Sequence, residues 1–195
     1  MKKHIFLWVF LLIISTFCFS QNKGFFSVGL NGGIIIPSSK LKSDYKLGDF
    51  GPVGALEVGY RVVKEIELVG NFVYSNLKIK DENLTDTKFY YIEGTVGGRL
   101  IGYSGKGRLF AEVCIGDFTF NAKWTYHMLL YSGVYLDTTI SKSESNPGIN
   151  FGAGGKYSFS KNWDFIFKIK YNRIFRKGPY ADYFSFNLGV NYLFR

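Results

Sequence analysis

The chain ends with Phe184-Ser-Phe-Asn-Leu-Gly-Val-Asn-Tyr-Leu-Phe-Arg195, and this stretch decides the fold. In an extended strand, successive side chains point to opposite faces. One face of this strand is large and apolar, and it carries Phe184, Phe186, Leu188, Val190, Tyr192 and Phe194. The other face is small and polar, and it carries Ser185, Asn187, Gly189 and Asn191. This pairing of faces is typical of a strand that turns its rings toward lipid.

The same residues resemble the C-terminal targeting signal of bacterial outer-membrane barrels. That signal reads polar, any, Gly, any, any, aromatic, any, aromatic. The matching residues here are Asn187, Gly189, Tyr192 and Phe194. The chain departs from the signal at Arg195, because such proteins usually end on the aromatic residue.

The N-terminus has the layout of a secretory signal peptide. Residues 1–4 are basic, residues 5–17 are mostly apolar, and small residues precede a cleavage site before Gln21. The apolar run is shorter than the ~20 residues that a membrane helix needs. We therefore predict a cleaved signal peptide over residues 1–20 and one barrel domain over residues 21–195.

Composition favours strands joined by turns. Aromatic residues make up 19% of the chain, glycine is abundant (23) and proline is scarce (4). The net charge of +9 would suit nucleic acid, but export argues against that partner. Cys114 and His127 are the only cysteine and histidine after the leader, so we expect no disulfide, no metal site and no cofactor.

Eight segments alternate between apolar and small or polar residues. They cover residues 25–36, 53–63, 66–79, 89–103, 108–118, 149–159, 163–175 and 184–194. Their connections alternate between long and short, so all long connections fall at one rim and both termini at the other. Short periplasmic turns and long outer loops are typical of outer-membrane barrels.

The volume of the interior decides which face points inward. An eight-stranded barrel is only wide enough for side chains to fill. The Phe and Tyr rings of the apolar faces are too many for that space, whereas the Gly, Ser and Asn of the other faces fit. The rings must therefore face lipid, and the sheet must close, because open sheet edges in lipid are costly.

Charged residues on the small faces then lie inside the barrel. They are Glu57, Arg61, Glu67, Glu93, Arg99, Glu112, Lys156, Lys168 and Lys170. Isolated buried charges are prohibitive, so we predict a Glu–Arg/Lys network that plugs the lumen. The alternative is that these charges line a narrow pore.

Residues 24–195 resemble the small outer-membrane β-barrel family, that is, the OmpA/OmpX-like and porin-family barrel domains. The resemblance implies an all-β, closed, antiparallel, up-and-down barrel in a Gram-negative outer membrane. It also implies termini in the periplasm, and insertion by the barrel assembly machinery with periplasmic chaperones. We expect a monomer.

Residues 117–147 allow two interpretations. Residues 124–131 and 134–140 read as a hairpin, either continuing strands five and six above the membrane or adding two spanning strands, for ten in all. An exposed, aromatic-tipped hairpin would be a contact surface for a partner.

For function, we expect a structural or surface-interactive barrel and no enzyme. Basic residues of the outer loops would contact lipopolysaccharide phosphates, namely Lys40, Lys42, Lys46, Lys78, Lys80, Lys88, Lys123, Arg176 and Lys177. The main alternative is a narrow channel for small solutes. A lipid A-modifying enzyme is a weaker alternative, because His127 is followed by Leu129 where deacylase barrels have Ser. The last alternative is a component of a secretion or gliding machine.

Overall fold

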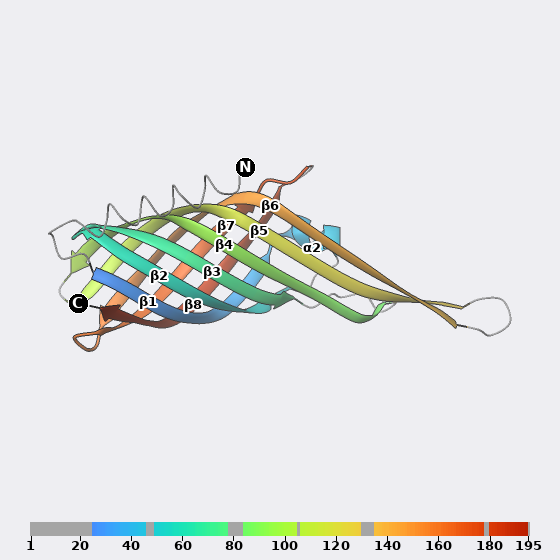
Figure 1. The fold of residues 1–195 in the computed structure, drawn as a ribbon, viewed down its shortest axis with the longest axis horizontal. Coiled ribbons are helices and arrows are strands. Elements are labelled where there is room, and N and C mark those ends of the chain that lie inside the picture. Colours follow the sequence, from blue (N-terminus) through green and yellow to red (C-terminus); the bar gives the residue numbers. More distant parts are fainter. Residues whose placement is uncertain are drawn as a thin grey trace, which may run out of the picture.

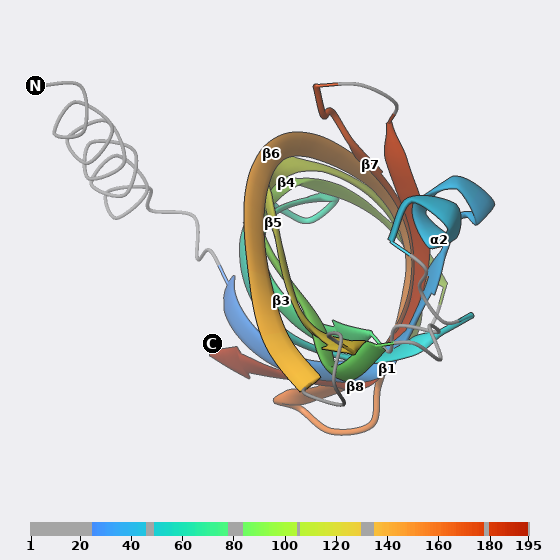
Figure 2. The ribbon, with the colours of Figure 1, turned by 90° about the vertical axis from the view of Figure 1, so that its right-hand side faces the viewer.

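The computed structural model describes residues 25–45, 49–77, 84–104, 106–129, 135–177 and 180–194. Within these ranges, eight antiparallel strands and one short helix form a closed barrel (Figures 1 and 2). The strands are β1 (Phe25–Pro37), β2 (Gly51–Val63), β3 (Ile66–Leu77), β4 (Leu84–Ser104), β5 (Gly107–Leu129), β6 (Tyr135–Ser158), β7 (Trp163–Ile174) and β8 (Ala181–Phe194). The helix is α2 (Ser39–Tyr45), between β1 and β2. The predicted signal peptide lies outside the described residues.

The C-terminal strand closes the barrel, because β8 pairs with β1 along its whole length. The ladder runs from Phe26 opposite Phe194 to Pro37 opposite Tyr183. Each other strand pairs with its neighbours in chain order. The prediction of an eight-stranded, up-and-down barrel is therefore confirmed.

The two ends of the barrel differ. The short connections β2–β3, β4–β5 and β6–β7 lie at the end where β1 begins and β8 stops, which we call the terminal rim. The longer connections lie at the opposite end, which we call the blade rim. The helix α2 sits beside the mouth of the ring at this end (Figure 2). No helix in the described ranges has the length and apolar character needed to cross a membrane.

The hairpin of β5 and β6 continues beyond the barrel, which confirms the first of the two interpretations of residues 117–147. These strands pair without interruption from Gly107 opposite Tyr157 to Leu129 opposite Tyr135. Figure 1 shows them projecting past the other strands. We call residues 117–129 of β5 and 135–147 of β6 the blade. The ten-stranded alternative is wrong, because these residues prolong two existing strands rather than adding new ones.

Two other connections hold more structure than predicted. The charged segment before residue 89 enters β4 at Leu84. The polar segment after residue 37 contains α2, whose first turn is capped by Ser38: the Leu41 amide donates to the Ser38 hydroxyl at 3.3 Å. Leu41 is buried, so the helix places an apolar side chain against the mouth of the barrel.

The two faces of each strand are distributed as the alternation of residues in the sequence predicts. The large apolar side chains are exposed on the outside, with Leu30 and Leu109 both at 66%. Most inward positions are small, polar or charged, and they are buried. The outer surface is therefore an apolar belt that fits hydrocarbon.

Apolar side chains also close the interior at both ends. Near the terminal rim, Ile101, Phe110 and Ile166 form a small buried cluster. Near the blade rim, a larger cluster contains inward rings that sequence reasoning missed, namely Phe89, Tyr91, Phe118, Phe120 and Tyr183. The ring centroids of Tyr91 and Phe120 lie 5.1 Å apart. The charged middle of the lumen thus lies between two apolar clusters.

We predict that arginine is far more costly in the middle of the belt than at its edge. Leu30→Arg places a charge near the bilayer midplane and should destabilise the barrel by about 2–4 kcal/mol. Val63→Arg, beside the terminal rim, should cost about 0–1 kcal/mol. Denaturant unfolding of the barrel in phospholipid vesicles measures both. Equal losses would contradict a lipid-facing belt.

Candidate functional site

The guanidinium of Arg99 is the centre of the buried charges. Antiparallel pairing puts Glu67 of β3 on one side of Arg99 and Glu112 of β5 on the other. Arg99 Nη1 lies 2.8 Å from Glu67 Oε2, and Nη2 lies 2.6 Å from Glu112 Oε2. Glu57 of β2 reaches the same guanidinium, with its Oε2 2.9 Å from Nη2. Arg99 thus joins carboxylates from three strands.

Two lysines from the other side of the barrel complete the cluster. Lys156 Nζ of β6 lies 2.8 Å from Glu67 Oε2. Lys168 Nζ of β7 lies 2.6 Å from Glu57 Oε2 and 3.9 Å from Glu112 Oε1. Three carboxylates therefore meet three cations, so this ionic cluster is neutral. Neutrality and hydrogen bonding are what make buried charges tolerable.

A second neutral pair lies one layer closer to the blade rim. Lys170 Nζ lies 2.8 Å from Glu93 Oε1. The other oxygen of Glu93 accepts hydrogen bonds from the Tyr91 and Tyr183 hydroxyls, at 3.0 and 2.9 Å. Asn150 Nδ2 donates to Oε1 at 3.0 Å. These tyrosines connect the charged layer to the apolar layer, because their rings belong to the cluster above it.

A third pair lies near the terminal rim. Arg108 of β5 forms an ion pair with Asp164 of β7. The Ser158 hydroxyl bridges them, accepting from Arg108 Nη2 at 2.8 Å and donating to Asp164 Oδ1 at 2.8 Å. Each buried anion described so far therefore has a cation beside it.

Two inward glycines make room for the carboxylates. A Cβ at Gly59 would lie 2.8 Å from Glu67 Oε1, and one at Gly152 would lie 2.7 Å from Glu112 Cγ. A side chain at either position would push a carboxylate out of its place. Small residues beside large charged ones are thus required by the narrow interior.

The structure brings together eight of the nine predicted interior charges and leaves out Arg61. Arg61 is opposite Glu67 in the β2–β3 ladder, but Glu67 turns to Arg99 and Lys156 instead. Arg61 is half-buried, and its Nε and Nη2 have no hydrogen-bond partner among the described residues. Alternation indicates which face a residue occupies, but it does not choose between competing partners.

Sequence reasoning missed the Arg108–Asp164 pair and the two tyrosines on Glu93. Asp164 occupies the polar face of its segment, so the alternation contained a signal for it. The alternation also placed Tyr91 on the face of Glu93 and Tyr183 on the face of Ser185, but large rings were expected only outside.

The residues of the proposed targeting signal lie in the strand that closes the barrel. Asn187 is buried opposite Lys168 in the β7–β8 ladder. Tyr192 packs between Trp163 and Phe194, with ring centroids 5.0 and 4.8 Å away. That these residues also address the chain to the outer membrane stays a prediction.

Residues 8–194 match the model of the outer membrane protein beta-barrel domain. The chain belongs to this family. An outer-membrane location in Gram-negative bacteria follows from that membership. No curated protein matches the sequence.

Several solved structures of outer-membrane proteins share this fold at low sequence identity. Neisserial surface protein A is 15% identical, with a TM-score of 0.62 over 87% of this chain and 97% of that one. Ail, the attachment invasion locus protein of Yersinia pestis, is 19% identical, with a TM-score of 0.56 over 88% and 97%. OprG from Pseudomonas aeruginosa is 12% identical, with a TM-score of 0.57 over 88% and 96%. These barrels support the fold assignment alone.

In this family member, the described residues contain no group of three or more His, Cys, Asp and Glu arranged to hold a metal ion. The interior charges bind one another, and they join strands that are distant in sequence.

We predict that removing one member of the Glu93–Lys170 pair costs more than removing both. Lys170→Met leaves the Glu93 carboxylate buried without its cation and should cost about 3–5 kcal/mol of unfolding free energy. Adding Glu93→Gln removes the unpaired charge and should recover most of that loss. A double-mutant cycle in denaturant measures the coupling. Additive losses in the two single variants would contradict a functional ion pair.

Proposed function

We propose that this protein is a closed outer-membrane barrel that carries a surface blade for binding an extended polypeptide. The observation that carries the proposal is the open edge of β6 beyond β7. The barrel acts as the rigid anchor, and the blade acts as the contact surface.

The edge begins where β7 ends. The β6–β7 ladder stops at Gly148 opposite Ile174, and the Phe175 amide then donates to the Pro147 carbonyl at 2.9 Å. Residues 135–146 of β6 have β5 as their only ladder partner in the part of the chain that the structure describes. One side of this strand is therefore available to another chain.

Alternation shows which residues face that side. The backbone carbonyl of Pro147 points toward β7. Along an antiparallel strand, the backbone N–H and C=O groups of successive residues point alternately to the strand on one side and to the strand on the other. Thr139, Ser141, Ser143 and Ser145 therefore direct their backbone N–H and C=O groups to the open edge. Their side chains are exposed and small. Such an edge accepts an added strand through main-chain hydrogen bonds, with little steric hindrance.

The interior supports an anchor rather than a pore. The proposal of a plug is supported by the ionic cluster in the middle of the lumen and by the apolar cluster on either side of it. The runner-up function, a narrow channel for small solutes, would require both apolar layers to open. The plug needs no such movement.

We propose no catalytic role and a monomeric state. His127 lies within the blade, opposite Asp137 in the β5–β6 ladder. The exposed Lys123 and Lys177 near the blade rim are suited to lipopolysaccharide phosphates, which we propose as the lipid partner there. Recruitment by the barrel assembly machinery and periplasmic chaperones, after cleavage of residues 1–20, belongs to the same proposal.

We predict that a proline on the β6 edge abolishes strand addition. Peptides selected from a random library on the vesicle-inserted barrel provide the probe. Ser143→Pro removes an edge donor and should weaken binding at least tenfold, because proline cannot donate a hydrogen bond. Ser143→Ala keeps the edge and should bind as the original does.

Hydrogen–deuterium exchange locates the bound peptide. Amides of residues 139, 141, 143 and 145 should exchange quickly in the free barrel and become protected in the complex. Binding that survives Ser143→Pro, or protection elsewhere on the barrel, would overturn the proposal.

We predict that the barrel conducts no steady current in planar bilayers, because its lumen is filled and capped. A known porin in the same membrane shows that insertion is detected. A steady current that disappears in Lys168→Met or Glu93→Gln would instead favour the channel.

A further inference from the structure

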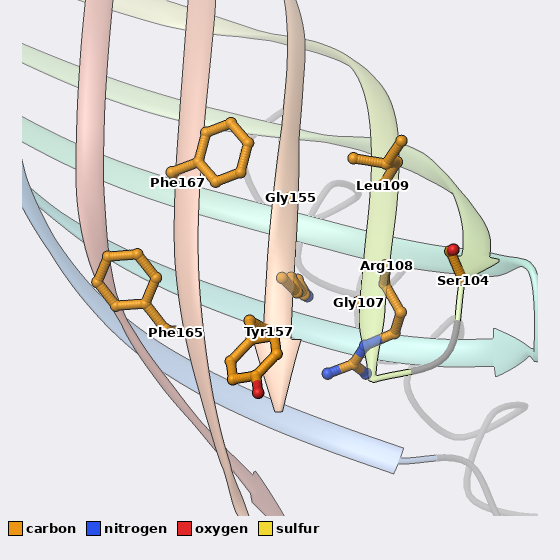
Figure 3. A pocket seen from close by; sticks show the side chains of 9 residues that line it. Ser104, Gly107, Arg108, Leu109, Gly155, Tyr157, Phe165 and Phe167 are labelled. Carbon is orange, nitrogen blue, oxygen red and sulfur yellow. The ribbon is translucent and has the colours of Figure 1, made fainter. Parts of the chain in front are cut away.

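The outer surface of the barrel has a hollow of about 380 Å³ near the terminal rim. It lies over β5, β6 and β7 in the apolar belt, and residues lining it include Ser104, Leu109, Gly155, Tyr157, Phe165 and Phe167 (Figure 3). Because this surface faces the membrane, whatever fills the hollow comes from the bilayer.

The deeper part of the hollow is apolar. Figure 3 shows Leu109 on one side and Phe165 and Phe167 on the other, with Gly155 between them. A Cβ at Gly155 would lie 2.5 Å from Cε1 of the Phe167 ring. The Phe167 ring therefore lies over Gly155, and the depression runs between this ring and Leu109. Its shape and chemistry suit an acyl chain.

The end of the hollow toward the rim is polar and positive. Figure 3 shows the Tyr157 hydroxyl at the bottom of the view, near the end of β6, and Ser104 at the right-hand side beyond Leu109. Two exposed lysines belong to the adjoining turns, Lys106 before β5 and Lys161 after β6. The Ser158 amide donates to the Lys106 carbonyl at 3.3 Å, which holds the first turn against β6.

No exposed acidic residue offsets these lysines within the two turns. The nearest carboxylate in sequence is Asp164, which is buried and paired with Arg108. An apolar groove thus lies beside two adjoining turns that each carry an exposed lysine. A lipid with a negatively charged headgroup matches both parts.

We propose that this hollow binds one anionic phospholipid of the periplasmic leaflet. Its phosphate lies between Lys106 and Lys161, and one acyl chain lies along Gly155 between Leu109 and Phe167. The leaflet follows from the rim, because the short turns of an outer-membrane barrel are periplasmic.

A neighbouring hollow provides an internal comparison. It measures about 370 Å³ and lies on the other side of Leu109, with Gly102 and Ala111 in its lining. Its rim residue is Glu65, which repels an anionic headgroup. The adjacent Lys64 is already engaged, with Nζ 4.9 Å from the centre of the Tyr103 ring. Two hollows of similar size thus differ in charge.

Native mass spectrometry of the full-length barrel purified from membranes tests the proposal. Phosphatidylglycerol and phosphatidylcholine with identical chains are the probes. One phosphatidylglycerol should be retained in preference to phosphatidylcholine. Lys106→Ala and Lys161→Ala should each reduce that preference roughly fivefold, and the double variant on the order of 30-fold. Lys64→Ala is the matched control and should leave the preference unchanged.

The apolar groove is tested separately. Gly155→Val displaces the Phe167 ring, which borders the depression, and should weaken retention of both lipids without changing their ratio. Gly102→Val makes the same change in the second hollow, where the nearest atom to a Cβ is 3.9 Å away, and should have no effect. Heat-modified mobility on gels confirms that each variant is folded.

Three results would overturn the proposal. They are equal retention of the two lipids, an equal effect of Lys64→Ala and Lys106→Ala, and displacement of the lipid by millimolar inorganic phosphate. The last would show that the lysines bind phosphate alone, without a contribution from the acyl groove.

Discussion

Closure of the sheet between β1 and β8 is the constraint on which the rest of the structure depends. In hydrocarbon, each unpaired backbone N–H or C=O costs several kcal/mol, so an open edge is not tolerated. The ladder from Phe26 to Pro37 removes that edge completely. A side chain at Gly33 would collide with the backbone of Phe186, so glycine is required for this close approach. Closure with eight strands then sets a narrow interior, and the narrow interior forces the rings outward.

The interior charges follow from the same constraint. A closed and narrow lumen removes most water, and a lone ion there is prohibitive. The buried ions form neutral groups, which lowers this cost. One group contains three cations, including Arg99, and three carboxylates, and the other is the Glu93–Lys170 pair. Partners come from strands on opposite sides of the ring, so the ions specify which strands face one another. Buried ion pairs add little net stability compared with apolar packing, but loss of one partner is costly.

The two rims meet different environments, and their structures differ accordingly. At the terminal rim the strands stop at the membrane surface, and turns with Lys106 and Lys161 stand beside a groove in the belt. At the blade rim, β5 and β6 continue into water, where solvent can satisfy the free side of β6. An open strand edge is therefore excluded within the bilayer and permitted above it. The proposed anchor and the proposed contact surface are separated by this difference in solvent.

The alternation of residues by itself determined the strands, their number and the face on which each residue lies. It placed Phe184 outside and Glu57 inside, because side-chain direction in a strand repeats every two residues. Only the tertiary structure decided which charges meet, since partners are set by register and by the diameter of the ring. This is why Arg61 stands apart while Glu67 joins Arg99. The tertiary structure also decided how far the blade extends and how the inward rings of Phe89 and Phe118 pack with their neighbours. Near the blade rim the lumen is filled by apolar side chains instead of ions. The residue pattern of one strand does not indicate which side chains the other strands contribute to that layer.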